Sequence, residues 1–264
     1  MFPRALFTAN PYSRGTQIYA STPPGLPAGM PSENLLALWY AGDGSGASSY
    51  VTTAGDGQPV DGWPDVAGSI APAATTTDRP TYDAVDANFN NRGVLVFDGG
   101  DELLLSLSGG IVGQLGTYAG YIVASSNVAA NADRAFYAEG RSSSDTPALI
   151  MRQVSSTGSD AELFHRYDNN TRIQATGTTA LNDGVVRLLT FGRAGADGFV
   201  RVNGVEEGTS SLAYSTTTID RIAIGALWRT GISMNALGRI AMIALYSTVD
   251  HAARESAAAT HYGL

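Results

Sequence analysis

The sequence predicts an all-β fold in which two antiparallel sheets pack face to face, preceded by an extended arm and closed by a short C-terminal helix. From Leu35 onward, short apolar or alternating runs recur, each bounded by turn residues. Glycine accounts for 31 of the 264 residues, about 12% where about 7% is usual. Charged residues make up only 15%, whereas about 25% is typical. A fold of many strands joined by turns and arranged in two layers accounts for the high glycine content and the low content of charged residues.

Composition narrows the classes of function. The chain has no cysteine and no lysine, so disulfides and a catalytic lysine are excluded. Its 16 arginines stand against 24 carboxylates, a formal charge of -8 that would repel a nucleic-acid backbone. No apolar run reaches the about 18 residues that a membrane span needs. We therefore expect neither nucleic-acid binding nor membrane insertion.

Residues 1–33 are predicted to form an extended arm that docks on a partner. The segment holds six of the chain's 11 prolines, which lack a backbone donor and disfavour helix. The alternative interpretation is a disordered leader, but a solvated tail gains nothing from large apolar side chains. The predicted docking side chains are Phe2, Leu6, Phe7, Tyr12, Ile18 and Tyr19. The folded domain then spans residues 34–264.

The expected strands follow from alternation and turn chemistry. They are 35–40, 93–97, 102–107, 117–125, 134–138, 147–154, 161–166, 171–176, 185–193, 198–202, 219–225 and 238–246. Asp168-Asn169-Asn170 and Asn203-Gly204 suit tight hairpin turns, which need residues that tolerate a positive φ. Residues 41–92 are expected to be loop-like. An alanine-rich helix is predicted at 248–260, with Gly263 as its left-handed cap.

Several segments, in order, carry a family resemblance. They are the turn at 62–69, Arg79-Pro80-Thr81-Tyr82 with the strand ending Phe97-Asp98-Gly99, the hairpin at 199–205, Ile222-Ala223-Ile224-Gly225, and 237–246 with the chain's last residues. This set resembles the concanavalin A-like lectin/glucanase superfamily, specifically the laminin-G-like jelly-roll domains of bacterial and phage proteins. The resemblance covers about 35 to 264 and implies a two-sheet jelly-roll sandwich. It implies less about function, because lectins, hydrolases, adhesion modules and virion proteins share the fold.

No catalytic pattern is visible. Glucanases of this fold place carboxylates as Glu-x-Asp-x-x-Glu, so that alternate side chains enter one cleft, and none of the seven glutamates begins that pattern. The densest acidic segment, 98–102, is interpreted as a turn. The glycine-rich segment 109–113 lacks the lysine of a phosphate-binding loop. We expect no catalytic residue.

No cofactor is expected either. His165, His251 and His261 lie far apart without metal-ligand spacing, which disfavours zinc. Calcium stays open as an alternative, because oxygen ligands gather in turns at Asp43, Asp56, Asp61 and Asp98.

A carbohydrate site needs an aromatic platform and nearby polar groups. Trp39 lies in an apolar run and is assigned to the core, and Trp63 is expected to pack against the long loop. Trp228 beside Arg229 is the exposed candidate. A second polar edge is predicted at Tyr167, Asp168, Asn169 and Asn170.

These observations predict that the chain is a non-enzymatic virion structural or display protein of a tailed phage or phage-like particle. It would decorate the capsid or form part of a head or tail fibre, docking on other virion proteins through the arm and attaching to host surface polysaccharide. No export signal is visible in the first residues, and particles released by lysis need none. A homo-oligomer is expected. The alternatives are a secreted or cell-surface carbohydrate-binding module, and a hydrolase with an unrecognised carboxylate pair about 5–9.5 Å apart.

Overall fold

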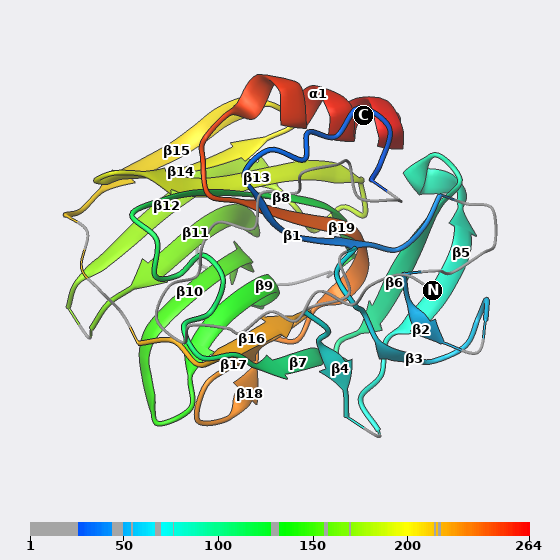
Figure 1. Cartoon of the computed structure of the whole chain (residues 1–264), viewed down its shortest axis with the longest axis horizontal. Helices are drawn as coiled ribbons and strands as arrows, with labels where there is room; N and C mark the ends of the chain where they lie inside the picture. Colours follow the sequence, from blue (N-terminus) through cyan, green and yellow to red (C-terminus); the bar gives the residue numbers. More distant parts are fainter. Residues whose placement is uncertain are drawn as a thin grey trace, which may run out of the picture.

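The computed structural model describes residues 26–43, 50–53, 55–66, 70–75, 77–127, 132–155, 158–168, 170–213, 215 and 218–264. Within these residues two large antiparallel sheets pack against each other, and a helix near the C-terminus lies over one of them (Figure 1). The predicted all-β sandwich is confirmed. The predicted docking side chains of the arm lie outside the described residues, so docking stays a prediction.

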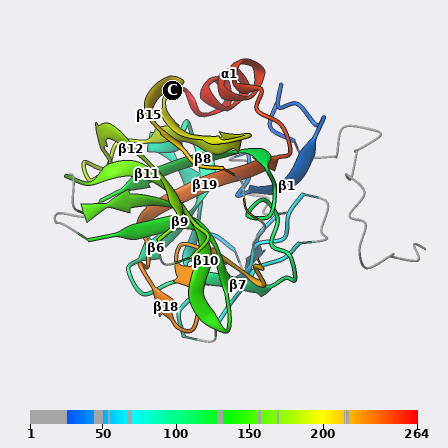
Figure 2. The ribbon, with the colours of Figure 1, turned by 90° about the vertical axis from the view of Figure 1, so that its left-hand side faces the viewer.

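The first sheet has eight strands, built around the last strand of the chain. Its order is β15 (Val205–Ser211), β14 (Asp197–Val202), β13 (Arg187–Ala194), β8 (Thr117–Ser126), β19 (Leu237–Tyr246), β6 (Arg92–Asp98) and β5 (Thr81–Asp86), with β1 (Leu35–Tyr40) also paired to β19. A single 3-10 turn, η1 (Ala87–Phe89), joins β5 to β6. The helix α1 (His251–Tyr262) lies over this sheet in Figure 2.

The second sheet has nine strands. Its order is β12 (Arg172–Ala180), β11 (Asp160–Arg166), β10 (Ser144–Val154), β9 (Arg134–Arg141), β16 (Arg221–Ile224), β7 (Leu103–Ser106), β4 (Ala73–Ala74), β3 (Val60–Gly62) and β2 (Thr52–Thr53). A separate small hairpin, β17 (Leu227–Trp228) and β18 (Ile232–Ser233), packs beside β9 and β16.

Each expected strand is observed, but the structure differs from the expectations in three other respects. The segment 41–92 is not loop-like, because it contributes β2, β3, β4 and β5. In β5 Tyr82 and Ala84 point inward, and the acidic residues beside them hid this pattern. β15 was also not expected, because it is an edge strand with no apolar face. α1 begins three residues later than predicted, since Asp250 is still extended.

The interior lies between the two sheets. Trp39 and Trp63 are both fully buried there. A core position was predicted for Trp39, whereas Trp63 was expected to pack against the long loop. A second apolar cluster lies under α1, on the outer side of the eight-stranded sheet, and includes Tyr121, Phe199 and Tyr262. A third, small cluster lies on the nine-stranded sheet under Leu227.

One side of the sandwich is closed where β12 meets β15. The Glu207 carboxylate of β15 accepts the backbone N–H groups of Thr178 and Thr179, both at 2.9 Å. A Cβ atom at Gly208 would clash with the backbone of Thr176, so the close approach needs glycine there. The two sheets are thus joined at this edge by side-chain bonds between their last strands.

Candidate functional site

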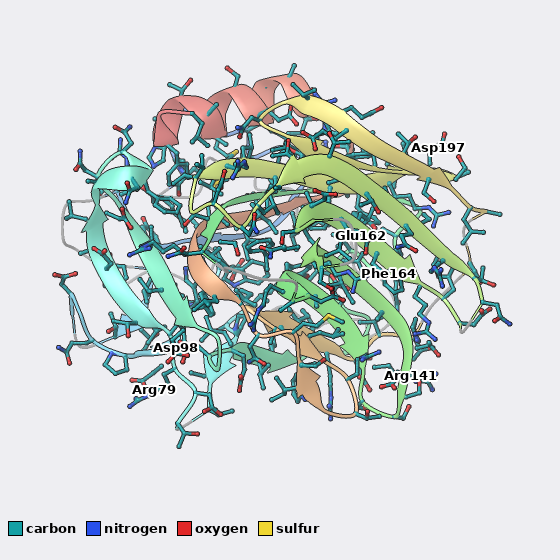
Figure 3. All side chains as sticks on the ribbon, turned by 180° about the vertical axis from the view of Figure 1, so that it is seen from behind. Arg79, Asp98, Arg141, Glu162, Phe164 and Asp197 are labelled. Atoms are coloured by element: carbon teal, nitrogen blue, oxygen red, sulfur yellow. The ribbon has the colours of Figure 1, made fainter. Side chains whose placement is uncertain are left out.

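The nine-stranded sheet leaves part of its outer side open. The β17–β18 hairpin packs on β9 and β16, where Leu227 covers Ala138 and Ile150. Strands β10, β11 and β12 continue beyond this cover, and Glu162 and Phe164 lie next to each other there in Figure 3. We call the outward side chains of these three strands the β10–β12 face: Arg152, Glu162, Phe164, Arg166, Arg172, Gln174 and Thr176.

Phe164 is the aromatic residue of this face. Strand alternation points its neighbour His165 inward, fully buried against Tyr118, and leaves Phe164 outward and half-buried. The guanidinium carbons of Arg152 and Arg172 lie 4.9 and 5.9 Å from its ring centroid. Both guanidinium groups therefore make favourable cation–π contacts with the ring.

Glu162 is buried beside Phe164 and fully hydrogen-bonded. The carboxylate is only 1% exposed. Its Oε1 accepts from Nε and Nη2 of Arg152, at 2.8 and 2.6 Å. Its Oε2 accepts from Gln174 Nε2 and Thr176 Oγ1, both at 2.9 Å. Four donors leave this carboxylate well paired despite its burial.

Arg152 joins Glu162 to a second carboxylate. Its Nη1 donates to Asp133 Oδ2 at 2.6 Å, while Asp133 Oδ1 accepts from the backbone and hydroxyl of Ser155 at 2.9 and 3.0 Å. The chain of ion pairs therefore runs from Asp133 through Arg152 to Glu162. Because each side chain is held by its neighbours, the polar groups of this face are fixed in place before any ligand arrives.

The predicted sugar platform at Trp228 is less open than expected. Trp228 is half-buried, and the Arg221 guanidinium lies 4.1 Å from the ring centroid. Arg229 donates to the Asp145 carbonyl at 3.3 Å, so its position is tied to the β9–β10 turn. Arg221 therefore lies closer to the Trp228 ring than Arg152 or Arg172 lies to the Phe164 ring.

The predicted edge at residues 167–170 is a structured turn. The Tyr167 side chain is only 9% exposed and packs on His165, with ring centroids 4.7 Å apart. Asp168 Oδ1 accepts the backbone N–H groups of Asn170 and Thr171 at 2.7 Å, and these bonds lower the pKa of Asp168. Asn169 lies outside the described residues. Trp228 and this turn are separated by β10 and β11 and do not form one site.

The glycine-rich segment 109–113 holds an anion that belongs to the chain. The backbone N–H groups of Ile111, Val112 and Gly113 donate to the Glu139 carboxylate at 3.1, 2.8 and 2.9 Å. A Cβ atom at Gly110 would clash with the same carboxylate. Burial raises the pKa of Glu139, against the effect of its donors. This segment is a structural loop around an internal carboxylate.

The turns proposed for calcium are occupied by internal bonds. Asp56 accepts from Ala84 N–H at 2.8 Å, Asp61 pairs with Arg79 at 2.6 Å, and Asp98 accepts from Gly100 N–H at 2.9 Å. Residues 98–102 form the turn before β7, as predicted. Across the described part of the chain, no three or more histidine, aspartate or glutamate residues are grouped to hold a metal ion. Nor does that part contain a helix long and apolar enough to cross a membrane.

Comparison with known proteins identifies the fold. No protein-family model and no curated protein matches the sequence. Domain 4 of AbnA, a GH43 extracellular arabinanase from Geobacillus stearothermophilus, superposes with a TM-score of 0.59 over 87% of this chain and 98% of that domain, at 14% identity. A Trypanosoma rangeli sialidase gives 0.56 over 86% of this chain and 33% of its own, at 12% identity. The CBM40 of a Ruminococcus gnavus sialidase gives 0.47 over 57% and 84%, at 15% identity.

At these identities the first two likenesses show the fold alone. Together with the two antiparallel sheets, they agree with the lectin-like jelly roll that the sequence resembles. The narrower resemblance, to the bacterial and phage type, finds no support in these structures.

Proposed function

We propose that this protein is a non-catalytic carbohydrate-binding module that holds a glycan on its β10–β12 face. The observation that carries the proposal is Phe164, an outward aromatic ring in contact with two guanidinium groups and beside a fully hydrogen-bonded carboxylate. An apolar surface flanked by fixed donors and acceptors is what a sugar requires, since a sugar offers both C–H faces and hydroxyl groups.

The sheet beneath the site also supports this proposal. Phe164 pairs in register with Ile150 on β10 and Gln174 on β12, so the ring stands over the middle of a three-strand floor. Met234, from the segment after β18, packs at the edge of this floor and contacts Arg152. A site on sheet strands is held more rigidly than one on loops, which favours preorganised binding.

The fold is compatible with this role. The arabinanase domain reported above was solved in complex with arabinotriose. That ligand belongs to that protein, but it illustrates that a sandwich of this shape can hold an oligosaccharide. A module of this kind works at a secreted or cell-surface position. The narrower prediction of a virion display protein has no support in the structures compared.

The carboxylates of the face support binding over hydrolysis. A glycosidase needs one carboxyl group as acid and another as nucleophile or base, both facing the substrate. Here Glu162 and Asp133 both pair with the single guanidinium of Arg152, and Glu162 is 1% exposed. Groups neutralised by one cation and buried from the ligand are suited to positioning side chains, not to proton transfer.

The test is a glycan array of bacterial and plant polysaccharides, followed by calorimetry on the best ligand. Phe164→Ala should weaken binding by at least about tenfold, because it removes the apolar platform. The matched control is Val205→Ala, an exposed apolar residue on the opposite sheet, which should bind as the wild type does. Silence of the wild type on every polysaccharide, or equal binding by Phe164→Ala, would overturn the proposal.

A further inference from the structure

Two arginines face each other across the β10–β12 face. Arg166 of β11 and Arg172 of β12 are register partners on the outward side. Like charges directly opposite on a sheet are destabilising. Arg166 donates its Nε to the Asp168 carbonyl at 2.9 Å. None of the ion pairs among the described residues includes Arg172, which is exposed.

Gln174 holds Arg172 in place. Its Oε1 accepts from Arg172 Nε at 3.0 Å, while its Nε2 donates to Glu162 Oε2 at 2.9 Å. The amide therefore links the buried ion pairs to the exposed guanidinium. Because Nε is used for this bond, the two terminal nitrogens of Arg172 stay available on the outward side.

The position of Arg172 relative to Phe164 also matters. Its guanidinium carbon lies 5.9 Å from the ring centroid, so a sugar on the ring would bring its substituents to the arginine. A planar guanidinium presents paired donors that match a carboxylate, forming strong charge-assisted bonds. An anion at this point would also offset the repulsion between the two arginines.

We infer that the β10–β12 face selects acidic glycans, with Arg172 binding a sugar carboxylate and Gln174 acting as its positioning residue. The inference rests on the proposed function and specifies its ligand class. Uronic acids and sialic acids share this chemistry, and the experiment separates them. The cation that makes the selection is Arg172, because the guanidinium of Arg152 is already shared by two carboxylates.

The experiment uses the full chain and matched glycan pairs: galacturonan oligomers, glucuronic acid-containing oligomers and sialyl oligosaccharides, each against its carboxyl methyl ester. The acidic form of the preferred glycan should bind at least about tenfold more tightly than its ester, since a charge-assisted pair is lost on esterification. The sugar series that shows this difference identifies the source of the carboxylate. Equal affinity for acid and ester would overturn the inference and leave the proposed function intact.

Variants separate recognition from folding. Arg172→Gln should abolish the preference for acid over ester, because the acid loses its charge-assisted pair and the ester has none to lose. Arg172→Lys, which keeps the charge but not the planar fork, should keep part of the preference. Arg79→Gln removes a half-buried arginine far from this face, one that pairs with Asp61, and should keep all of the preference. An undiminished preference for the acid in Arg172→Gln would contradict the inference. If the wild type binds none of the glycans, the proposed function is overturned together with the inference.

Gln174→Leu tests the positioning role. It should reduce the ratio of acid to ester affinity by about threefold or more, because Arg172 loses its orienting acceptor and the acid depends on Arg172 more than the ester does. Thr178→Ala, at an exposed position of the same strand, is the control. A uniform loss of affinity for both ligand forms would indicate a merely structural role and refute this assignment.

Discussion

The outer face of the eight-stranded sheet is largely apolar and covered by α1, whereas the β10–β12 face of the nine-stranded sheet is charged and uncovered. Tyr121 and Phe199 of the eight-stranded sheet and Tyr262 of α1 lie in one buried cluster. On the β10–β12 face, the corresponding outward positions hold Arg152 and Glu162, paired with each other. The apolar surface of the eight-stranded sheet is removed from water because α1 covers it. The β10–β12 face needs no cover because its buried charges are paired and hydrogen-bonded.

This difference separates stability from binding within one sandwich. A face sealed by a helix contributes to the free energy of unfolding and offers little to a ligand. A face whose polar groups are held by each other keeps a fixed geometry in contact with solvent. Substitutions on the two faces should therefore have different dominant effects, and the following predictions test that separation.

The largest expected effect is on the covered face. Tyr262 is the last residue of α1, is 1% exposed and packs into the cluster between the helix and the eight-stranded sheet, so Tyr262→Ala should lower the free energy of unfolding by about 3–5 kcal/mol. Urea denaturation measures this, with the exposed Thr260→Ala on the same helix as control, within about 0.5 kcal/mol of wild type. Glycan affinity of the folded variant should be unchanged. A loss below about 1 kcal/mol would mean that α1 does not seal this face.

The next effect is on the open face. Arg152→Met leaves the buried Glu162 without its cation, and should cost about 3 kcal/mol. The double variant Arg152→Met with Glu162→Leu should recover part of this loss, because it removes the unpaired charge as well. Chemical denaturation of both variants gives the comparison. If the single variant loses less than about 1 kcal/mol, the pair behaves as a solvent-exposed salt bridge and the face is less rigid than described.

Acid should weaken the covered face through His261 of α1. The ring is 8% exposed and bonds Tyr40 Oη at 2.9 Å, and burial and Arg92 lower the pKa of His261 from 6.5 to about 4. Between those values the unfolded chain binds a proton that the native ring does not, so stability falls as pH falls. The slope per histidine is about 1.4 kcal/mol per pH unit. Nearby Asp43 acts in the opposite direction but does not reverse the shift.

The measurement is the unfolding free energy from pH 7 to pH 5, compared with His261→Gln. The variant should show a shallower decline, with the rest of the decline coming from His165, whose pKa burial lowers to about 3, and from His251, whose pKa is also lowered. Identical slopes for wild type and variant would show that His261 is accessible to protons in the folded protein.

Much of the sandwich could be predicted from the sequence because its buried strands are visibly apolar. The continuous apolar runs of β8 and β19 and the turn at Asn203-Gly204 follow local rules, and Asn203 and Gly204 both adopt the positive φ that the turn requires. Edge strands lack this apolar signal. β15 and β2 have little apolar character because only one side of each is paired, and pairing partners far along the chain decide their conformation.

The candidate site was harder to predict for a related reason. Glu162, Phe164, Gln174 and Thr176 alternate along β11 and β12, which is a visible signal of one polar face. The phase of that alternation is not visible, because His165 is polar yet buried and Phe164 is apolar yet outward. Only the register of β10, β11 and β12 brings Arg152 to Glu162. A sequence-based search for exposed tryptophan therefore led to Trp228.

The smallest expected effect concerns that tryptophan. Trp228→Ala should change glycan affinity by less than about threefold, because the Arg221 guanidinium already lies 4.1 Å from its ring centroid and β10 separates it from β11. Calorimetry with the ligand used for Phe164→Ala measures it, and Ile232→Ala on β18 controls for disturbance of the hairpin. If Trp228→Ala abolishes binding while Phe164→Ala does not, the glycan site lies on the β17–β18 hairpin. In that case the open, charged face would be a solvated surface held together by its own ion pairs, and the contrast between the two outer faces would concern stability alone.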